Sequence, residues 1–145
     1  MKQENQCGAY IKHINDVLQK ECNNALQKKG LTMSQLIVLH QLENTPNGEM
    51  PLKELEKNLQ VAQSTTAGII SRLEQKGFVE GYGSAEDKRI KIVRITESGH
   101  KCFMEAQIYS LESEKHLLAG LTESECDMFN ILLKKVSENL KKNAH

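Results

Sequence analysis

Apolar residues recur at steps of three and four over most of the chain, which is the spacing of amphipathic helices. The first such helix is predicted over Tyr10–Leu26, and Gly30 ends it. A second helix begins at Thr32, where Thr32 and Gln35 have the spacing of a capping box. It runs into the turn-forming segment "NTPNG", so the chain opens with two helices separated by a short break.

Two shorter helices are predicted next. The first starts at Pro51, and the second ends at Gly77, which occupies the C′ position. Between them, "NLQVAQS" is too polar and too short to be anything but a tight turn, so the pair forms a helix-turn-helix. The residues expected to face inward are Leu52, Leu55, Leu59, Thr66, Ile69, Ile70 and Leu73.

A change from helical spacing to alternation marks a hairpin after this pair. Strands are predicted over Phe78–Glu80 and Arg89–Ile95, with Ile90 and Ile92 on one face and charged residues on the other. The loop between the strands is built on Gly81, Gly83 and Ser84. The pattern therefore predicts a two-stranded wing beside the helix-turn-helix.

The last third returns to helical spacing. One helix begins near Thr96, and "TESE" at Thr122–Glu125 is a capping box that opens a final helix. The apolar positions of the two helices are Phe103, Met104, Ala106, Ile108 and Leu111, and then Phe129, Leu132, Leu133, Val136 and Leu140. We expect the second set to face inward.

Composition narrows the functional classes. The chain has 145 residues, as expected for one domain, and its 19 basic and 19 acidic side chains give a net charge of zero. A nucleic-acid surface would therefore have to be a local patch. A hydrophobic fraction of 39% without Trp favours outer helices that are buried against another copy. With no membrane-length apolar run and no signal peptide, we expect a cytoplasmic protein that does not bind membranes.

The order of these motifs resembles the MarR family of bacterial transcriptional regulators over nearly the whole chain. The similar segments are "LTMSQLIVLHQL", "LKELEKNLQVAQSTTAGIISRLEQKGFVE", "EDKRIKIVRIT" with Gly99, and "LTESE". The resemblance implies a mainly α (α+β) fold, a winged helix-turn-helix with N- and C-terminal dimerisation helices. Residues 31–96 would bind DNA, and residues 1–30 and 97–145 would join two copies, in one compact domain overall. The implied partners are a second copy and a palindromic operator in double-stranded DNA.

The start of the second short helix has the side chains that a recognition helix needs. Small polar residues there let the backbone approach base edges and phosphates, and a glutamine reads adenine most readily. A cluster of N-capping residues on a solvated helix is the alternative explanation. The candidate DNA-binding residues on this helix are Gln63, Ser64, Thr65, Ala67, Gly68, Ser71 and Arg72.

The tip of the hairpin carries the second group of candidates. By the resemblance, Arg89 enters the minor groove and Asp87 holds it in place, while Lys88 and Lys91 suit adjacent phosphates. A charged tip that only keeps the edge solvated is the alternative. The chain departs from the family pattern at Gly68, where a larger side chain is common, and at Gly81, where an arginine is common.

Three signals could control such a regulator: a small ligand, thiol oxidation or a metal ion. The resemblance favours a small aromatic or phenolic ligand, with Ile11, Ile14, His40 and Phe103 as candidate lining. A thiol sensor built on Cys22 and Cys126 is an alternative. The alternative to such a sensor is that the cysteines are buried as small hydrophobes. The chain also has Cys7 and Cys102, and all four cysteines are expected to be free thiols. Their spacing excludes a zinc finger or ribbon.

We expect no metal site, no cofactor and no enzymatic activity. The histidines lack an i,i+4 pair, and no nucleophile elbow, phosphate-cradling loop or paired catalytic carboxylates are recognisable. The contrasting function is a protein-interaction module of the same shape that has lost DNA binding. The sequence thus predicts a homodimeric regulator, with a repressor released by a ligand as the favoured form.

Overall fold

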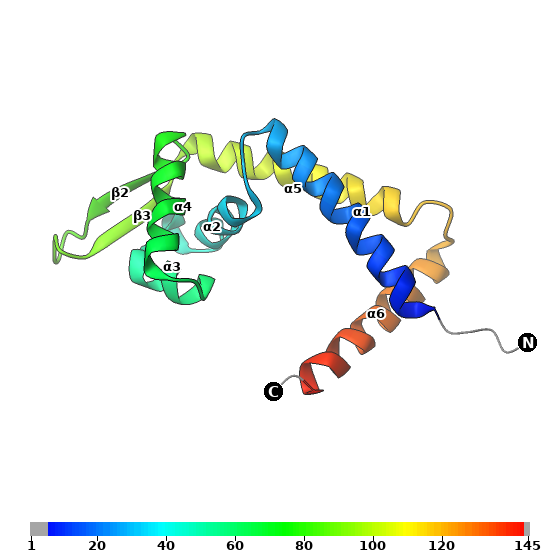
Figure 1. Cartoon of the computed structure of the whole chain (residues 1–145). Coiled ribbons are helices and arrows are strands. Elements are labelled where there is room, and N and C mark those ends of the chain that lie inside the picture. Colours follow the sequence, from blue (N-terminus) through cyan, green and yellow to red (C-terminus); the bar gives the residue numbers. More distant parts are fainter. Residues whose placement is uncertain (1–5, 144–145) are drawn as a thin grey trace, which may run out of the picture. The chain divides into compact units, whose positions relative to one another are not determined.

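The computed structural model of the protein describes residues 6–143 and has the predicted mainly α fold (Figure 1). The strands form one antiparallel sheet in the order β1-β3-β2. In chain order the elements are α1 (Cys7–Lys28), α2 (Met33–Glu43), the 3-10 turn η1 (Pro46–Gly48), β1 (Glu49–Pro51), α3 (Leu52–Leu59), α4 (Gln63–Gln75), β2 (Val79–Gly83), β3 (Lys91–Ile95), α5 (Glu97–Leu117) and α6 (Glu123–Asn143).

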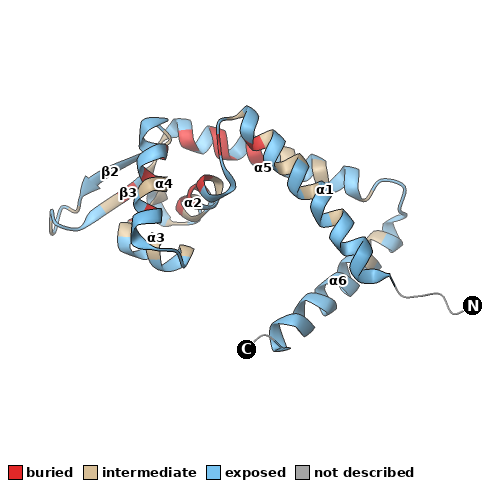
Figure 2. Cartoon of the chain, in the orientation of Figure 1, coloured by how far each residue is buried: buried red, intermediate tan, exposed pale blue. Residues whose placement is uncertain are grey.

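The chain divides into two compact units that meet between Ser110 and Leu111, within α5. The hydrophobic core belongs to the first unit, where buried residues gather on α2, α4 and the first half of α5 (Figure 2). Its fully buried side chains are Val38, Leu39, Leu42, Leu55, Thr66, Ile70, Leu73 and Val93. Every helix of the helix-turn-helix thus has one face in this core.

The predicted helix ends are confirmed where the signal is local. At Thr32, the hydroxyl accepts from the Gln35 amide and the Gln35 side chain accepts from the Thr32 amide, both at 3.2 Å. The same reciprocal pair joins Thr122 and Glu125 ahead of α6. Gly77 has a φ of 75°, which is the left-handed conformation expected at the C′ position of α4.

The sheet differs from the prediction in three ways. Glu49–Pro51 forms a third strand, β1, that pairs with β3, whereas the sequence predicts only two strands and a helix start at Pro51. β2 continues to Gly83 instead of ending at Glu80, so two of the expected loop glycines lie within the strand. β3 begins at Lys91, and Ile90 lies outside it in the loop.

We define the wing as residues 79–95, which comprise β2, β3 and their loop; in Figure 1 it extends away from α3 and α4. Strand alternation gives it two faces. Val79 and Val93 are buried on the inner face. Glu80, Tyr82 and Arg94 lie on the outer face, where Arg94 pairs in register with Glu80 on one side and with Glu49 on the other.

The junction between the wing and α5 is built from Thr96 and Gly99. The Thr96 hydroxyl donates to the Gly77 carbonyl at 2.6 Å and accepts from the Gly99 amide at 3.1 Å, while the Thr96 amide donates to the Phe78 carbonyl. Gly99 is buried against that same carbonyl, and a Cβ on Gly99 would overlap the Phe78 oxygen. The end of α4, the start of β2 and the first turn of α5 are therefore fixed to one another.

In the second unit, most apolar side chains of α6 are exposed. None of the described residues of α6 is buried, and only Cys126 and Phe129 are half-buried (Figure 2). The predicted apolar stripe exists, but it does not face inward in the single chain, since Leu132 is 52% exposed and Leu140 is 67% exposed. On α5, Met104, Ile108 and Leu111 are exposed as well.

The junction generates a test of fold stability. Gly99→Ala forces a methyl group into a backbone carbonyl that cannot rotate away, so we expect unfolding to be favoured by about 1–3 kcal/mol or more. Gly68→Ala is the matched control, because its Cβ would meet nothing within 4 Å and Ala stabilises a helix interior by about 1 kcal/mol. Urea unfolding followed by circular dichroism measures both variants. Equal midpoints for the two would contradict the proposed role of the junction.

Candidate nucleic-acid interface

The first turn of α4 is polar, exposed and uncapped. The turn after α3 is closed by Gln60 in the left-handed conformation, with a φ of 54°, and Ala62 is the N-cap residue of α4. No side chain among residues 6–143 makes a capping bond at this end. Gln63, Ser64 and Thr65 are thus not used as caps, and their role in DNA binding stays a prediction. Their side chains face solvent and are available to a phosphate or a base edge.

The exposed face of α4 continues from this turn. Ala67, Ser71 and Arg72 are exposed, whereas Thr66, Ile70 and Leu73 on the opposite face are buried in the core. Gly68 is half-buried and has open space where a Cβ would lie. The structure therefore brings the predicted residues of α4 onto the outer side of the helix, except for Gly68, which lies at its margin.

The tip of the wing is a tight turn that positions an arginine. The Ile90 amide donates to the Asp87 carbonyl at 3.0 Å, and the Ser84 amide donates to the Ile90 carbonyl at 2.8 Å. Within the turn the Arg89 amide donates to the Asp87 carboxylate at 3.0 Å, the two-residue bond typical of aspartate in turns. At Gly83, a Cβ would lie 2.8 Å from the Lys88 carbonyl oxygen, so the close approach of the loop requires glycine there.

The guanidinium of Arg89 is held by the same carboxylate. Its Nε and one terminal nitrogen lie 3.1 and 3.2 Å from the two oxygens of Asp87, a two-pronged ion pair. This side-chain bond, followed by the backbone bond, lowers the pKa of Asp87 below its usual value of 3.8. The Arg89 side chain is nevertheless 91% exposed. The Arg89 guanidinium is thus held in one orientation and is also exposed, and a group that inserts into a groove must be both.

Three of the other basic residues of this region also have partners. Lys91 lies 3.0 Å from Glu74 of α4, Arg94 pairs with Glu80, and Lys76 donates to Gln35 and to the Gly30 carbonyl. Among the described residues from Leu52 to Arg94, the basic side chains outside any ion pair or side-chain bond are Lys53, Lys57, Arg72 and Lys88. The local positive charge is thus smaller than the count of lysines and arginines suggests.

Sequence reasoning missed the network on the outer face of the wing. Arg94 donates to Glu80, its guanidinium lies 5.4 Å from the centre of the Tyr82 ring, and Tyr82 donates to Glu49 of β1. The hydrogen bond to Glu49 raises the pKa of Tyr82, and the bond to Glu80 raises that of Arg94. The hairpin register would have placed Arg94 opposite Glu80, but the pairing with Glu49 required the unpredicted strand.

The candidate ligand residues are only partly brought together. The rings of His40 and Phe103 lie 5.8 Å apart and line a cavity of about 290 Å³ between α2 and α5. The other residues that line it are Leu36, Ile37, Ala106, Gln107 and Ser110. Ile11 and Ile14 are on α1 and are not among them.

The candidate redox residues are both half-buried. Cys22 lines a separate hollow with Leu18 and Met33, and Cys126 lies in the first turn of α6, in the second unit. Cys102 is buried in the core, and this burial raises its thiol pKa, which makes it a poor nucleophile. Thiol sensing by Cys22 and Cys126 stays a prediction.

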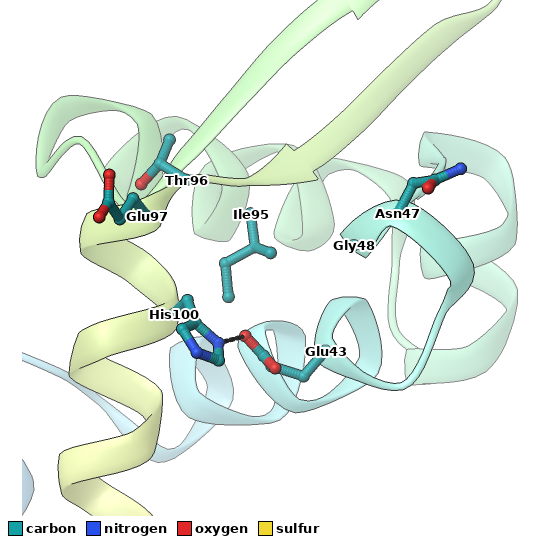
Figure 3. A pocket seen from close by; sticks show the side chains of 7 residues that line it. All are labelled: Glu43, Asn47, Gly48, Ile95, Thr96, Glu97 and His100. Atoms are coloured by element: carbon teal, nitrogen blue, oxygen red, sulfur yellow. Dashed lines mark hydrogen bonds and ion pairs between the residues drawn. The ribbon is translucent and has the colours of Figure 1, made fainter.

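A further polar contact joins α2 to α5. The His100 ring lies 2.5 Å from the Glu43 carboxylate, and both line a pocket of about 350 Å³ together with Asn47, Gly48, Ile95, Thr96 and Glu97 (Figure 3). Among residues 6–143, no three His, Cys, Asp or Glu side chains are arranged to hold a metal ion. In the same range, no helix is both long and apolar enough to cross a membrane.

Two helices are packed against the core, the second helix has an exposed polar face, and a hairpin with an arginine at its tip lies beside them. This arrangement defines a winged helix-turn-helix of the DNA-binding kind. The MarR family model matches residues 31–91. An uncharacterised helix-turn-helix regulator of Bacillus subtilis, YwoH, is 33% identical over 118 residues, which span 81% of this chain and 84% of YwoH. The chain therefore belongs to the MarR family of helix-turn-helix transcriptional regulators.

Two further comparisons bear on function. The repressor IacR of Pseudomonas putida is 33% identical over 94 residues, which cover 65% of this chain and 56% of IacR. A MarR variant from E. coli, solved in complex with operator DNA, superposes with a TM-score of 0.67 at 28% identity. That superposition covers 89% of this chain and 91% of MarR. The fold shared with a DNA-bound relative supports DNA as a partner.

The Asp87–Arg89 pair generates a test by titration. Because the pKa of Asp87 is lowered in the folded protein, the pair contributes stability above the usual value of 3.8. This contribution disappears as the pH falls through the lowered value. Carbon NMR of the Asp87 carboxyl should show a midpoint below 3.8 in the unmodified protein and a higher midpoint in Arg89→Ala, which keeps only the backbone hydrogen bond. Lys88→Ala, the control, should leave the midpoint where it is. An identical midpoint with and without Arg89 would contradict the pairing.

Proposed function

We propose that the protein acts as a homodimeric repressor that binds a palindromic operator and releases it when a small aromatic ligand binds. The observation that carries the DNA contact is the exposed arginine at the tip of the wing, held by the Asp87 carboxylate beside the turn. A narrow minor groove has an enhanced negative potential, to which an extended guanidinium is suited. Repression is supported by the similarity to IacR, a repressor.

The contacts divide between two grooves. Gln63, Ser64 and Thr65 enter the major groove at the start of α4, where Gln63 reads a base edge and the helix amides approach a phosphate. Ala67, Gly68 and Ser71 line the helix beside them. Arg72 and Lys88, neither of which has an acidic partner among the described residues, contact the phosphates. Arg89 is the minor-groove residue.

A second copy of the chain completes the operator contact. Dyad-related recognition helices reach successive major grooves, whose centres are about 34 Å apart, only when two copies are held together. The exposed apolar stripe of α6 and the exposed Tyr10, Ile11 and Val17 of α1 are the surfaces that such an association would bury. Apolar stripes of this length are uncommon on the surface of a monomer.

Ligand release uses the cavity between α2 and α5. It is lined mainly by apolar side chains, and the tilted rings of His40 and Phe103 suit an aromatic molecule. α2 is packed in the core with α4, and α5 begins at the junction with the wing. A ligand that changes the separation of α2 and α5 therefore changes the position of the DNA-binding elements in each copy, and a few ångströms suffice to prevent simultaneous docking.

Arg89→Ala tests the DNA contact. We expect a loss of roughly 1–3 kcal/mol of binding free energy on a duplex selected from a random library with the unmodified protein. Arg89→Lys should recover little, because an ammonium cannot make the two-pronged pair with Asp87. Electrophoretic mobility shift measures the three dissociation constants. A dimer that selects no duplex, or an Arg89→Ala variant that binds equally well, would favour the interaction module instead.

Leu133→Gln tests the association of two copies. Burial of a leucine contributes roughly 1.5–3 kcal/mol, and a two-fold interface contains each residue twice. The dimer dissociation constant should therefore rise by roughly 100-fold or more, as measured by sedimentation equilibrium. Lys134→Gln introduces the same residue one position further along, off the apolar stripe, and should leave the constant unchanged. An unmodified protein that remains a single copy in dilute solution would refute the proposal.

A further inference from the structure

The half of the wing nearer its tip has almost no apolar side chain that could pack against α4. On its inner face Val79 and Val93 reach the core, but the next two inward positions of β2 are Gly81 and Gly83. Lys91 is the next inward residue of β3 beyond Val93, and it pairs in register with Gly83. Past the two valines, the inner face therefore consists of two glycines and one lysine.

Lys91 bridges that gap. Its ammonium lies 3.0 Å from the carboxylate of Glu74, which is the penultimate residue of α4. The pair links the strand that leads from the wing tip to the helix that carries Gln63, Ser64 and Thr65. Among the described residues, no other ion pair joins the wing to α4.

Gly81 makes room for this bridge. A Cβ on Gly81 would lie 2.5 Å from the Cε atom of Lys91, 3.3 Å from its ammonium and 3.2 Å from the Glu74 carboxylate. The lysine stem thus crosses β2 where Gly81 has no side chain. Gly81 has no positive φ, so its backbone conformation does not require glycine, and the passage of the lysine is what its small size permits.

We propose that Lys91 is a positioning residue, which holds the wing on the recognition helix through Glu74 so that both DNA-contacting elements keep one relative orientation. The proposal rests on the proposed DNA-binding function. The charge of Lys91 is taken up by Glu74 and is not spent on a phosphate. Because both side chains are about 40% exposed, the pair contributes little to folding stability, at most about 1 kcal/mol. Its effect on DNA affinity is accordingly limited to about fivefold.

The opposite role makes different predictions. If Lys91 contacts a phosphate, its removal lowers the slope of log affinity against log salt by about 0.9. Removal of Glu74 then strengthens binding, because one negative charge leaves the interface. In the positioning role, Lys91→Gln and Glu74→Gln weaken binding by similar factors and leave the slope unchanged. The double variant is then no weaker than either single variant.

Gly81→Ala provides the sharpest variant, because it displaces the lysine from Glu74 without altering any charge. We expect it to weaken binding by about the same factor as Glu74→Gln, at most about fivefold. Gly8→Ala, on α1, controls for a glycine replacement with open space around it. Lys88→Gln shows the response of a lysine placed on a phosphate, which should lower the salt slope by about 0.9. Affinities are measured at several salt concentrations on the duplex selected with the unmodified protein. Unchanged or tighter binding by Gly81→Ala would overturn the inference.

A measurement without DNA separates this inference from the proposed function. Nitrogen-15 relaxation of the loop between β2 and β3 should show lower order parameters in Glu74→Gln, Lys91→Gln and Gly81→Ala than in the unmodified protein. Order parameters that stay the same in all three variants would refute the bridge, whatever the protein binds. An unmodified protein that selects no duplex would refute the DNA-binding function, while the relaxation data would still decide whether the wing is held.

Discussion

The arrangement of the DNA-contacting elements depends on the close packing of Gly99 against the carbonyl of Phe78. This contact brings the first turn of α5 onto the end of the helix-turn-helix, where the Thr96 hydroxyl joins the Gly77 carbonyl to the Gly99 amide. One small residue and one hydroxyl thereby fix three segments that meet at a single point. At the next residue of α5, the His100–Glu43 contact joins the same helix to the end of α2. The start of α5 is therefore joined both to the end of α4 and to the end of α2.

Beyond Val79 and Val93, which lie in the core, the wing is held by charged groups. Its outer face is crossed by the Glu49–Tyr82–Arg94–Glu80 network, and its inner face is bridged to α4 by one lysine. At the tip, Asp87 holds Arg89 within a turn of its own. Each of these pairs is exposed, so each sets direction more than it adds stability. A wing built in this way can orient a side chain far from the hydrophobic core.

Local signals were enough to predict much of this. Thr32 and Gln35, or Asp87 and Arg89, are three and two residues apart, and their hydrogen bonds depend only on the helix or turn that contains them. The alternation of the hairpin was recognisable, but its ends were not, because Gly81 and Gly83 are typical of loops and yet extend β2.

Contacts between distant segments could not be predicted in the same way. β1 was missed because its partner, β3, is more than forty residues away and because Pro51 is typical of a helix start. The bridge from Lys91 to Glu74 depends on a register that the sequence does not specify. The stripe on α6 predicted an amphipathic helix, and a single sequence carries no information on what covers it. Thus the fold could be predicted from the sequence, whereas the contacts that orient the wing became visible only in the structure.

The pairing of cations with neighbouring carboxylates has a consequence for how such a regulator moves through a genome. Lysines and arginines that already pair with a carboxylate release few counterions when the protein binds DNA of arbitrary sequence. Non-specific binding through these residues is therefore weak. Each unproductive encounter is then brief. A cell can keep few copies of the protein and still have them reach their target, since few are detained elsewhere along the chromosome.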